Sequence, residues 1–128
     1  MWSWDLRSAR DLTAYRSSLR EAVTATPVPA EVTADDVEAL LLAFEELASN
    51  GLRHGEGPVR VSVSATADGW LIDVTDAAPG RLPVPALDRD PALGGLGLHL
   101  VARLCTSHGW WVESSRKHVW GWLSSLPA

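Results

Sequence analysis

One apolar segment, residues 34–54, constrains the fold more than any other feature, because its spacing predicts a single long helix. The large apolar side chains recur every three or four residues and share one face: Val37, Leu40, Leu41, Phe44, Leu47, Ala48 and Leu52. Thr33 is a candidate N-cap before the segment, and Gly55 is a candidate stop just after it. Small alanines continue the opposite face. We therefore expect a helix that other elements cover on much of its circumference.

Glu46 and Asn50 lie on this second face, four residues apart and hence neighbours on a helix. A carboxylate and an amide at this spacing are most often solvated surface residues. The alternative is that both project into a cleft. There, Asn50 would offer an oxygen ligand to Mg²⁺, and Glu46 would orient or deprotonate an attacking hydroxyl.

The rest of the chain supplies two more helices and two strand pairs. We expect, in order, a helix over 8–23, strands over 59–64 and 70–75, a long loop over 81–93, a helix over 98–105, and strands over 110–114 and 117–123. A length of 128 residues fits one domain, so residues 1–128 are expected to form a single one. The order of elements predicts an α+β two-layer sandwich, with helices on one side of an antiparallel or mixed sheet.

Composition narrows the classes of function. The net charge is −5 and no run of Lys or Arg occurs, which argues against binding nucleic acid through a basic surface. The single cysteine, Cys105, excludes an intramolecular disulfide. No stretch approaches the ~18 apolar residues of a membrane span, and the first residues lack a secretory signal pattern. We therefore expect a cytoplasmic protein that binds neither nucleic acid nor membrane.

Asp76 ends the second predicted strand and is followed by small residues. A carboxylate at a strand end can accept a hydrogen bond from an exocyclic amine, for example that of adenine, and small neighbours leave room for a flat ring. The alternative is an aspartate that merely starts a turn, which is common.

Two glycines, Gly95 and Gly97, open the third predicted helix. Backbone N–H groups at a helix N-terminus bind phosphate, although glycine pairs often serve only as hinges. The chain contains neither a P-loop nor a dinucleotide-binding fingerprint.

Together these segments resemble a known superfamily. Residues 46–55, Glu-Leu-Ala-Ser-Asn-Gly-Leu-Arg-His-Gly, look like the N box of the Bergerat-fold ATPases, the superfamily of gyrase and histidine kinases. Residues 76–80 resemble its first glycine box, and residues 95–98 its second. The Asn-x-x-Arg-His-Gly ending and residues 117–120 resemble one branch, the small bacterial anti-sigma-factor serine kinases. A histidine kinase is disfavoured, because no dimerisation helix with a phosphorylatable histidine precedes the domain.

The resemblance implies the Bergerat ATP-binding fold and a set of residue roles. In that family an asparagine binds Mg²⁺, a glutamate is the catalytic base and an aspartate reads adenine, which correspond here to Asn50, Glu46 and Asp76. The other nucleotide-binding positions that the resemblance implies are Arg53, His54, Gly80, Gly95, Leu96, Gly97 and Leu98. For His54, an ordinary helix-end position near the C-terminal carbonyls is an equal alternative.

The function implied by the resemblance is that of a protein serine/threonine kinase that uses ATP and Mg²⁺. It would phosphorylate an anti-sigma-factor antagonist protein, sequester a sigma factor and act as a homodimer. The alternative is a nucleotide-sensing binding module that holds a partner without transferring phosphate. Ala78, where the first box usually has Gly or Ser, and a short proline-rich lid over residues 81–94 favour that alternative. The intact Glu46 favours the kinase.

Overall fold

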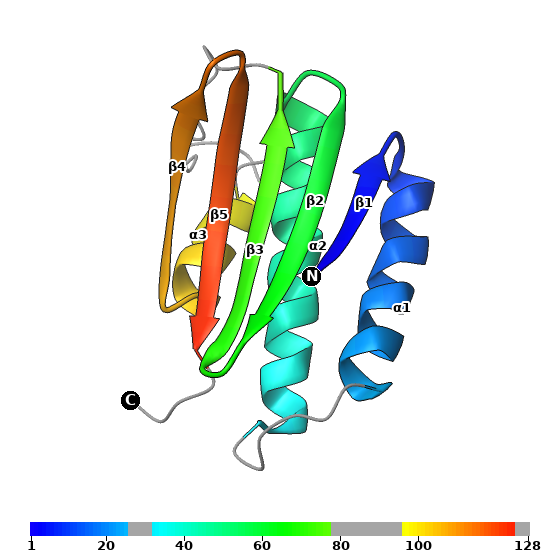
Figure 1. The fold of residues 1–128 in the computed structure, drawn as a ribbon, viewed down its shortest axis with the longest axis vertical. Coiled ribbons are helices and arrows are strands. Elements are labelled where there is room, and N and C mark those ends of the chain that lie inside the picture. The colour runs from blue at the N-terminus through cyan, green and yellow to red at the C-terminus, as the bar shows by residue number, and fades with distance from the viewer. Residues whose placement is uncertain (26–31, 78–95, 125–128) are drawn as a thin grey trace.

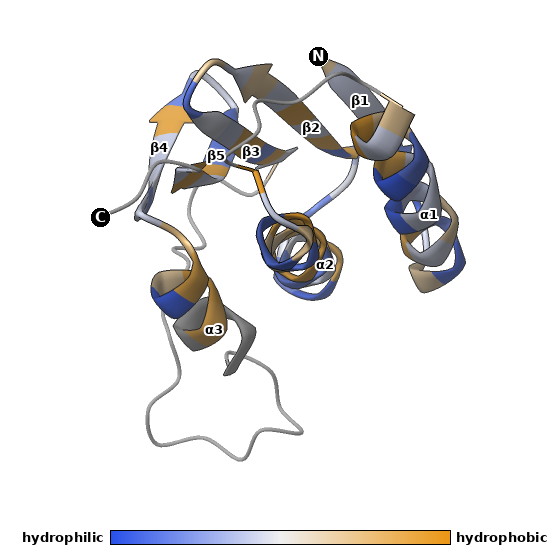
Figure 2. Ribbon diagram, turned by 90° about the horizontal axis from the view of Figure 1, so that it is seen from below, coloured by the Kyte–Doolittle hydropathy of each residue, from blue (hydrophilic) through white to orange (hydrophobic). Residues whose placement is uncertain are grey.

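The computed structural model describes residues 1–25, 32–77 and 96–124, with the backbone alone for residues 96–99. In chain order the elements are β1 (Trp2–Leu6), α1 (Ala9–Ala25), α2 (Ala34–His54), β2 (Val59–Thr66), β3 (Gly69–Asp76), α3 (Leu96–Leu104), β4 (Ser107–Glu113) and β5 (Arg116–Ser124). The strands form one sheet in the order β1-β2-β3-β5-β4, and every pair is antiparallel (Figure 1). Figure 2 shows the helices on one face of this sheet. The predicted two-layer α/β architecture is therefore confirmed.

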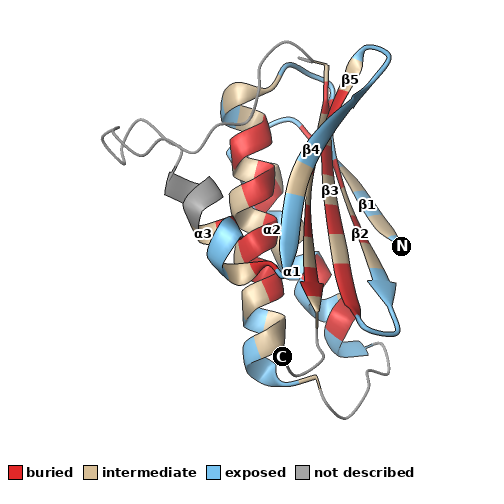
Figure 3. Ribbon diagram, turned by 90° about the vertical axis from the view of Figure 1, so that its left-hand side faces the viewer, coloured by how far each residue is buried: buried red, intermediate tan, exposed pale blue. Residues whose placement is uncertain are grey.

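The central helix α2 has the predicted bounds, because local signals fix both of its ends. Thr33 accepts a hydrogen bond from the Asp36 backbone N–H at 3.1 Å, and the Asp36 carboxylate accepts one from the Thr33 N–H at 2.9 Å. This reciprocal capping box satisfies two backbone donors that the first turn would otherwise leave unpaired. Figure 3 shows buried residues on successive turns of α2, as expected for a helix covered on much of its circumference.

The core lies between α2 and the inner face of the sheet. Alternate residues of three strands point to it and are buried: Val59, Val61, Val63, Trp70, Ile72, Val74, Val119 and Leu123. Gly51 of α2 faces them, and a Cβ added there would lie 2.8 Å from Val74 Cγ1 and 3.3 Å from Val59 Cγ1. The sequence reading that Gly51 permits a close approach is therefore confirmed. Any side chain at this position would push α2 away from the sheet.

The N-terminal strand β1 is absent from the sequence prediction. It pairs with β2, with Trp4 opposite Val61, and its inward side chains Trp2, Trp4 and Leu6 alternate. The Trp4 ring lies 5.9 Å from that of Tyr15 and 5.6 Å from that of Phe44, between centroids. Aromatic packing against both longer helices therefore holds this five-residue edge strand in place.

Some predicted boundaries were wrong. Helix α3 begins at Leu96 rather than at residue 98. In the closing hairpin, β4 begins at Ser107 rather than 110, and the turn is centred on Ser114, whose φ of 54° lies in the left-handed region. Arg116, predicted to lie in that turn, instead starts β5 and pairs with Glu113. At the turn, β5 thus begins one residue earlier than predicted and β4 ends one residue earlier, at Glu113.

The predicted loop over 81–93, together with Ala78, Gly80 and Gly95, lies outside the described residues. Within the described ranges, no helix is long and apolar enough to cross a membrane. The assignment of residues 1–128 to a single domain stays a prediction.

Candidate functional site

The end of α2 meets the end of β3, and this junction carries Asp76. A Cβ added to Gly55 would lie 2.7 Å from Asp76 Cγ and 2.8 Å from its Oδ2, so the carboxylate rests directly against the Gly55 backbone. One residue further on each side, the Ala77 N–H donates a hydrogen bond to the Glu56 carbonyl at 2.8 Å. Asp76 itself is only 1% exposed. The two elements thus hold one carboxylate in a buried and fixed position.

Glycine is required at position 55 because of close packing, and not because of the backbone conformation that a helix-ending glycine usually adopts. A helix-ending glycine commonly adopts a left-handed conformation, but Gly55 has φ −88° and ψ 177°, which any residue can adopt. The helix does end at His54 as predicted. The need for glycine comes instead from two close neighbours, because a Cβ here would lie 2.6 Å from the Gly51 carbonyl oxygen as well as 2.7 Å from Asp76 Cγ.

Glu46 and Asn50 lie one turn apart on α2, within the last half of the helix. Asn50 is buried with 7% of its surface exposed, and Glu46 is half-buried. On the same face, Ala43 is fully buried. Asn50 is therefore not a solvated surface residue, which was the more common interpretation of this spacing. Buried amides form hydrogen bonds or bind ligands, and Asn50 has the oxygen donor that Mg²⁺ prefers.

Arg53 and His54 occupy the last turn of α2. Arg53 is exposed and His54 is half-buried. Cationic side chains are favourable near the negative end of a helix, which by itself accounts for both positions. Their contribution to a binding site stays a prediction.

Lys117 is a residue of this junction that sequence reasoning did not select. It lies directly opposite Asp76 in the register of β3 and β5. Its Nζ is 3.5 Å from Asp76 Oδ2, and the two side chains are 4% and 2% exposed. A signal was available in the alternation of β5, because Lys117 shares the inward-facing register of Val119. A lysine in a core register is rarely buried unless it is paired.

The glycine-containing start of α3 is described in its backbone only. Leu96, Gly97 and Leu98 form the first turn of this nine-residue helix, and phosphate binding there stays a prediction. The helix then packs against α2 (Figure 2). At its end, burial raises the pKa of the Cys105 thiol to about 11, so that Cys105 is a neutral core residue at physiological pH.

A cavity of about 450 Å³ lies where the end of β1, the end of α2 and the start of β2 meet. Its lining consists of Asp5, Leu6, Arg7, Leu52, Gly55, Gly57, Pro58 and Val59. Of the residues predicted to bind or react, none belongs to this lining. Gly55 is the residue that the two regions share, because it lines the cavity and also lies against Asp76.

The donor set of the candidate site fits a nucleotide with Mg²⁺. The buried Asp76 carboxylate is a hydrogen-bond acceptor for a base amine, and the Asn50 amide oxygen is a hard donor suited to Mg²⁺. Glu46 supplies a second carboxylate one helical turn from Asn50. The α3 N-terminus supplies backbone N–H groups suited to phosphate.

Comparison with known proteins agrees with this chemistry. The family model of the histidine kinase-like ATPase domain matches residues 9–120, which is most of the chain. Among curated proteins, none matches the chain. The matched range runs from the start of α1 into β5 and includes Glu46, Asn50 and Asp76. The chain therefore belongs to the family of histidine kinase-like ATPase domains.

Proposed function

We propose that this ATPase domain is a protein serine/threonine kinase of the anti-sigma-factor branch. The observation that supports it best is the arrangement along α2. A half-buried Glu46 stands one turn from the buried Asn50, and the helix ends against the buried Asp76. A potential catalytic base and a potential metal ligand thus lie one turn apart on α2, and the carboxylate proposed to bind adenine lies against the end of that helix.

Each residue has a distinct role in this proposal. Asp76 accepts a hydrogen bond from the adenine amine, Asn50 holds Mg²⁺, and the backbone at Gly97 binds phosphate. Bound ATP supplies the phosphoryl group, which passes to a serine or threonine oxygen while ADP leaves and Mg²⁺ offsets the negative charge. Glu46 orients the attacking hydroxyl and accepts its proton.

The proposed partners are an anti-sigma-factor antagonist, which is phosphorylated, and a sigma factor, which is sequestered. We also propose that the protein acts as a homodimer in the cytoplasm. Support for this branch comes from the sequence ending of α2, Arg53-His54-Gly55, and from residues 117–120 of β5. Arg53 is exposed at the helix end, where it can contact a partner.

A second candidate function is a nucleotide-sensing module without phosphotransfer. The observation that favours it is the contact of Lys117 with Asp76 at 3.5 Å, which places a cation beside the carboxylate proposed to bind adenine. Ala78 adds to this, since a bulkier residue than glycine follows the carboxylate.

The test is phosphotransfer from labelled ATP with Mg²⁺ to candidate antagonist proteins of the same genome, using wild type, Glu46→Gln and Glu45→Gln. Glu46→Gln keeps size and hydrogen bonding but cannot accept a proton, so transfer should fall by about 10²–10⁴-fold with ATP affinity retained. Glu45, which pairs with Arg16 at 3.3 Å, is the matched control and should leave transfer unchanged.

Two outcomes decide between the candidates. If wild type binds ATP and a partner but transfers no phosphate to any candidate, the binding module is the better description. If Glu46→Gln transfers phosphate at the wild-type rate, Glu46 is not the base and the kinase proposal loses its central residue.

A further inference from the structure

We infer that β4 is a dimerisation edge, at which a second copy of this chain pairs its own β4 antiparallel and joins the two five-stranded sheets into one. This inference rests on the homodimer of the proposed function and names the surface that forms it. Figure 1 shows β4 as the outermost strand on one side of the sheet, next to β5 alone.

The exposed apolar side chains gather on this edge. Trp110, Trp111 and Val112 are consecutive residues of β4 and are 43%, 45% and 42% exposed, and they are three of the four large apolar side chains that are exposed among the described residues. Trp110 lies opposite the buried Val119 of β5, so Trp110 and Val112 lie on the helix-covered side of the sheet and Trp111 on the open side. An edge strand that is apolar and exposed on both sides is typical of an interaction surface.

The strand β4 also lacks the features that normally keep an edge from pairing. Between Ser107 and Glu113 the chain has neither lysine nor proline, and the register against β5 advances one residue at a time without a bulge. The other edge strand, β1, is two residues shorter, and its Asp5 forms an ion pair with Arg60 at 3.0 Å. Figure 2 shows α1 beside β1. Of the two edges, β4 is therefore the longer and the less protected one.

The sequence of β4 is complementary to itself about a two-fold axis at Trp110. Antiparallel self-pairing there sets Trp110 opposite its own copy, Gly109 opposite Trp111, and Ser107 opposite Glu113. The first pair brings two apolar rings together, and the last brings a hydroxyl donor to a carboxylate acceptor. No like charges lie directly opposite one another. A closed dimer of two identical chains therefore fits this edge.

Gly109 leaves room for an aromatic ring of the second copy on the open side of the sheet. A Cβ at Gly109 would lie 3.1 Å from Trp120 Cζ2, so the Trp120 ring of β5 extends over the glycine. Trp111 of the second copy lies opposite Gly109 in this pairing and meets that ring. Within its own chain Trp111 stacks on His118, with 3.9 Å between the ring centroids. The contact is thus formed by rings whose positions are fixed before association.

The first test is sedimentation velocity of wild type, Trp110→Lys and Ser3→Lys over a concentration series. A single strand edge is smaller than a standard interface of roughly 1,600 Å², so the wild-type dimer should dissociate on dilution. Trp110→Lys sets two ammonium groups opposite each other and removes the central apolar contact, so the dissociation constant should rise about 30-fold or more. Ser3→Lys is the matched control, because it places the same cation at an exposed position of the other edge strand, and it should keep the wild-type constant.

The second test determines the register and leaves every apolar side chain in place. Ser107→Cys and Glu113→Cys, both at exposed positions, are mixed and treated with a short bis-maleimide. In the proposed pairing the two thiols lie opposite each other, whereas two copies of either residue are separated by six strand positions, about 20 Å. The mixture should therefore crosslink, and each variant alone should not. Wild type, whose single thiol is the buried Cys105, is the blank.

The remaining outcomes overturn the inference. These are a wild type that stays monomeric at every concentration, a dimer that Trp110→Lys leaves intact, and single variants that crosslink as readily as the mixture. Phosphotransfer from ATP, measured on the same wild-type sample, separates this inference from the proposed function. Transfer by a monomer overturns the inference and leaves the kinase in place, whereas a β4 dimer without transfer supports the inference and counts against the kinase.

Discussion

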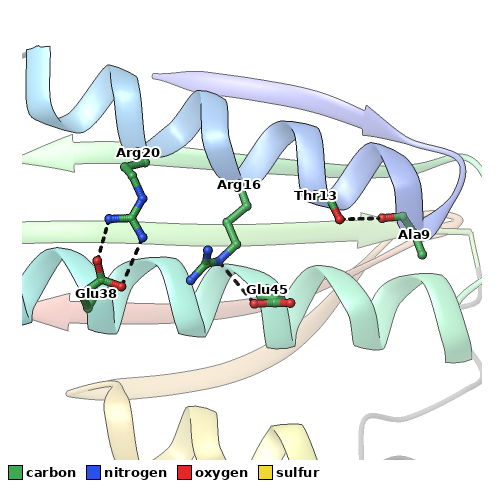
Figure 4. A network of polar contacts seen from close by, with 6 residues as sticks. All are labelled: Ala9, Thr13, Arg16, Arg20, Glu38 and Glu45. Carbon is green, nitrogen blue, oxygen red and sulfur yellow. Dashed lines mark hydrogen bonds and ion pairs between the residues drawn. The ribbon is translucent and has the colours of Figure 1, made fainter.

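Two ion pairs in this protein differ in opposite ways: the pair with the shorter distance is exposed, and the pair with the longer distance is buried. On the helical surface, Arg20 of α1 contacts Glu38 of α2 at 2.6 Å and 3.3 Å (Figure 4), while their side chains remain 44% and 53% exposed. At the end of the sheet, Lys117 and Asp76 are 3.5 Å apart with almost no exposure. Solvent and salt screen the surface pair, whereas neither charge of the inner pair can return to water without unfolding.

The comparison teaches that the longer contact is the more consequential one. Removing one member of an exposed pair leaves a solvated charge, but removing one member of a buried pair leaves an uncompensated charge in the core. The predictions below follow from this difference, from the largest expected effect to the smallest.

Breaking the inner pair should have the largest effect on stability. Asp76→Ala and Lys117→Met should each lower the free energy of unfolding by about 3–5 kcal/mol, because each strands a buried charge. The double variant should recover most of this loss, since no charge is left behind. Urea denaturation of wild type, both single variants and the double variant measures the cycle. Additive losses in the double variant would show that the two charges do not depend on each other.

Crowding the Asp76 carboxylate should have an intermediate effect. In Gly55→Ala the new Cβ would lie 2.6 Å from the Gly51 carbonyl oxygen and 2.7 Å from Asp76 Cγ, so the free energy of unfolding should fall by about 1–3 kcal/mol and, as Asp76 is displaced, ATP affinity should fall with it. Gly57→Ala is the control, because a Cβ there meets nothing within 4 Å. Urea denaturation and ATP titration on both variants test the prediction, and equal behaviour of the two would contradict it.

Breaking the surface pair should have the smallest effect. The hydrogen bond from Arg20 lowers the pKa of Glu38, so the contribution of the pair is present above the ordinary glutamate pKa of 4.5 and is lost as the pH falls through the lowered value. Arg20→Ala should shift the urea midpoint only slightly at neutral pH, and the shift should vanish in molar salt or in acid. A shift as large as that of Lys117→Met would remove the distinction between the two pairs.

The part of the fold that follows local rules was predictable from the sequence. The α2 helix was predicted with its observed bounds because its capping box, apolar stripe and stop lie within one contiguous segment. The strand β1 was missed because it exists through pairing with β2 and packing on Tyr15 and Phe44, which are distant in the sequence.

The residues of the candidate site also fall into those that a local sequence pattern indicates and those that depend on the tertiary fold. Glu46 and Asn50 could be selected as candidates because one helical turn relates them, and Asp76 because it ends an alternating strand. Lys117 was not assigned to the site, because its importance depends on the register that sets it opposite Asp76. The predicted turn of the closing hairpin was one residue too late, because no glycine or asparagine marks the turn at Ser114.

The most direct test of the central claim, that Asp76 reads the adenine amine, is calorimetric titration of ATP with Mg²⁺ into wild type and Asp76→Ala, each checked to be folded. Loss of one hydrogen bond to a buried site costs about 1–3 kcal/mol, so the variant should bind ATP about 5- to 150-fold more weakly. Equal affinity of the two proteins for ATP would contradict the assignment.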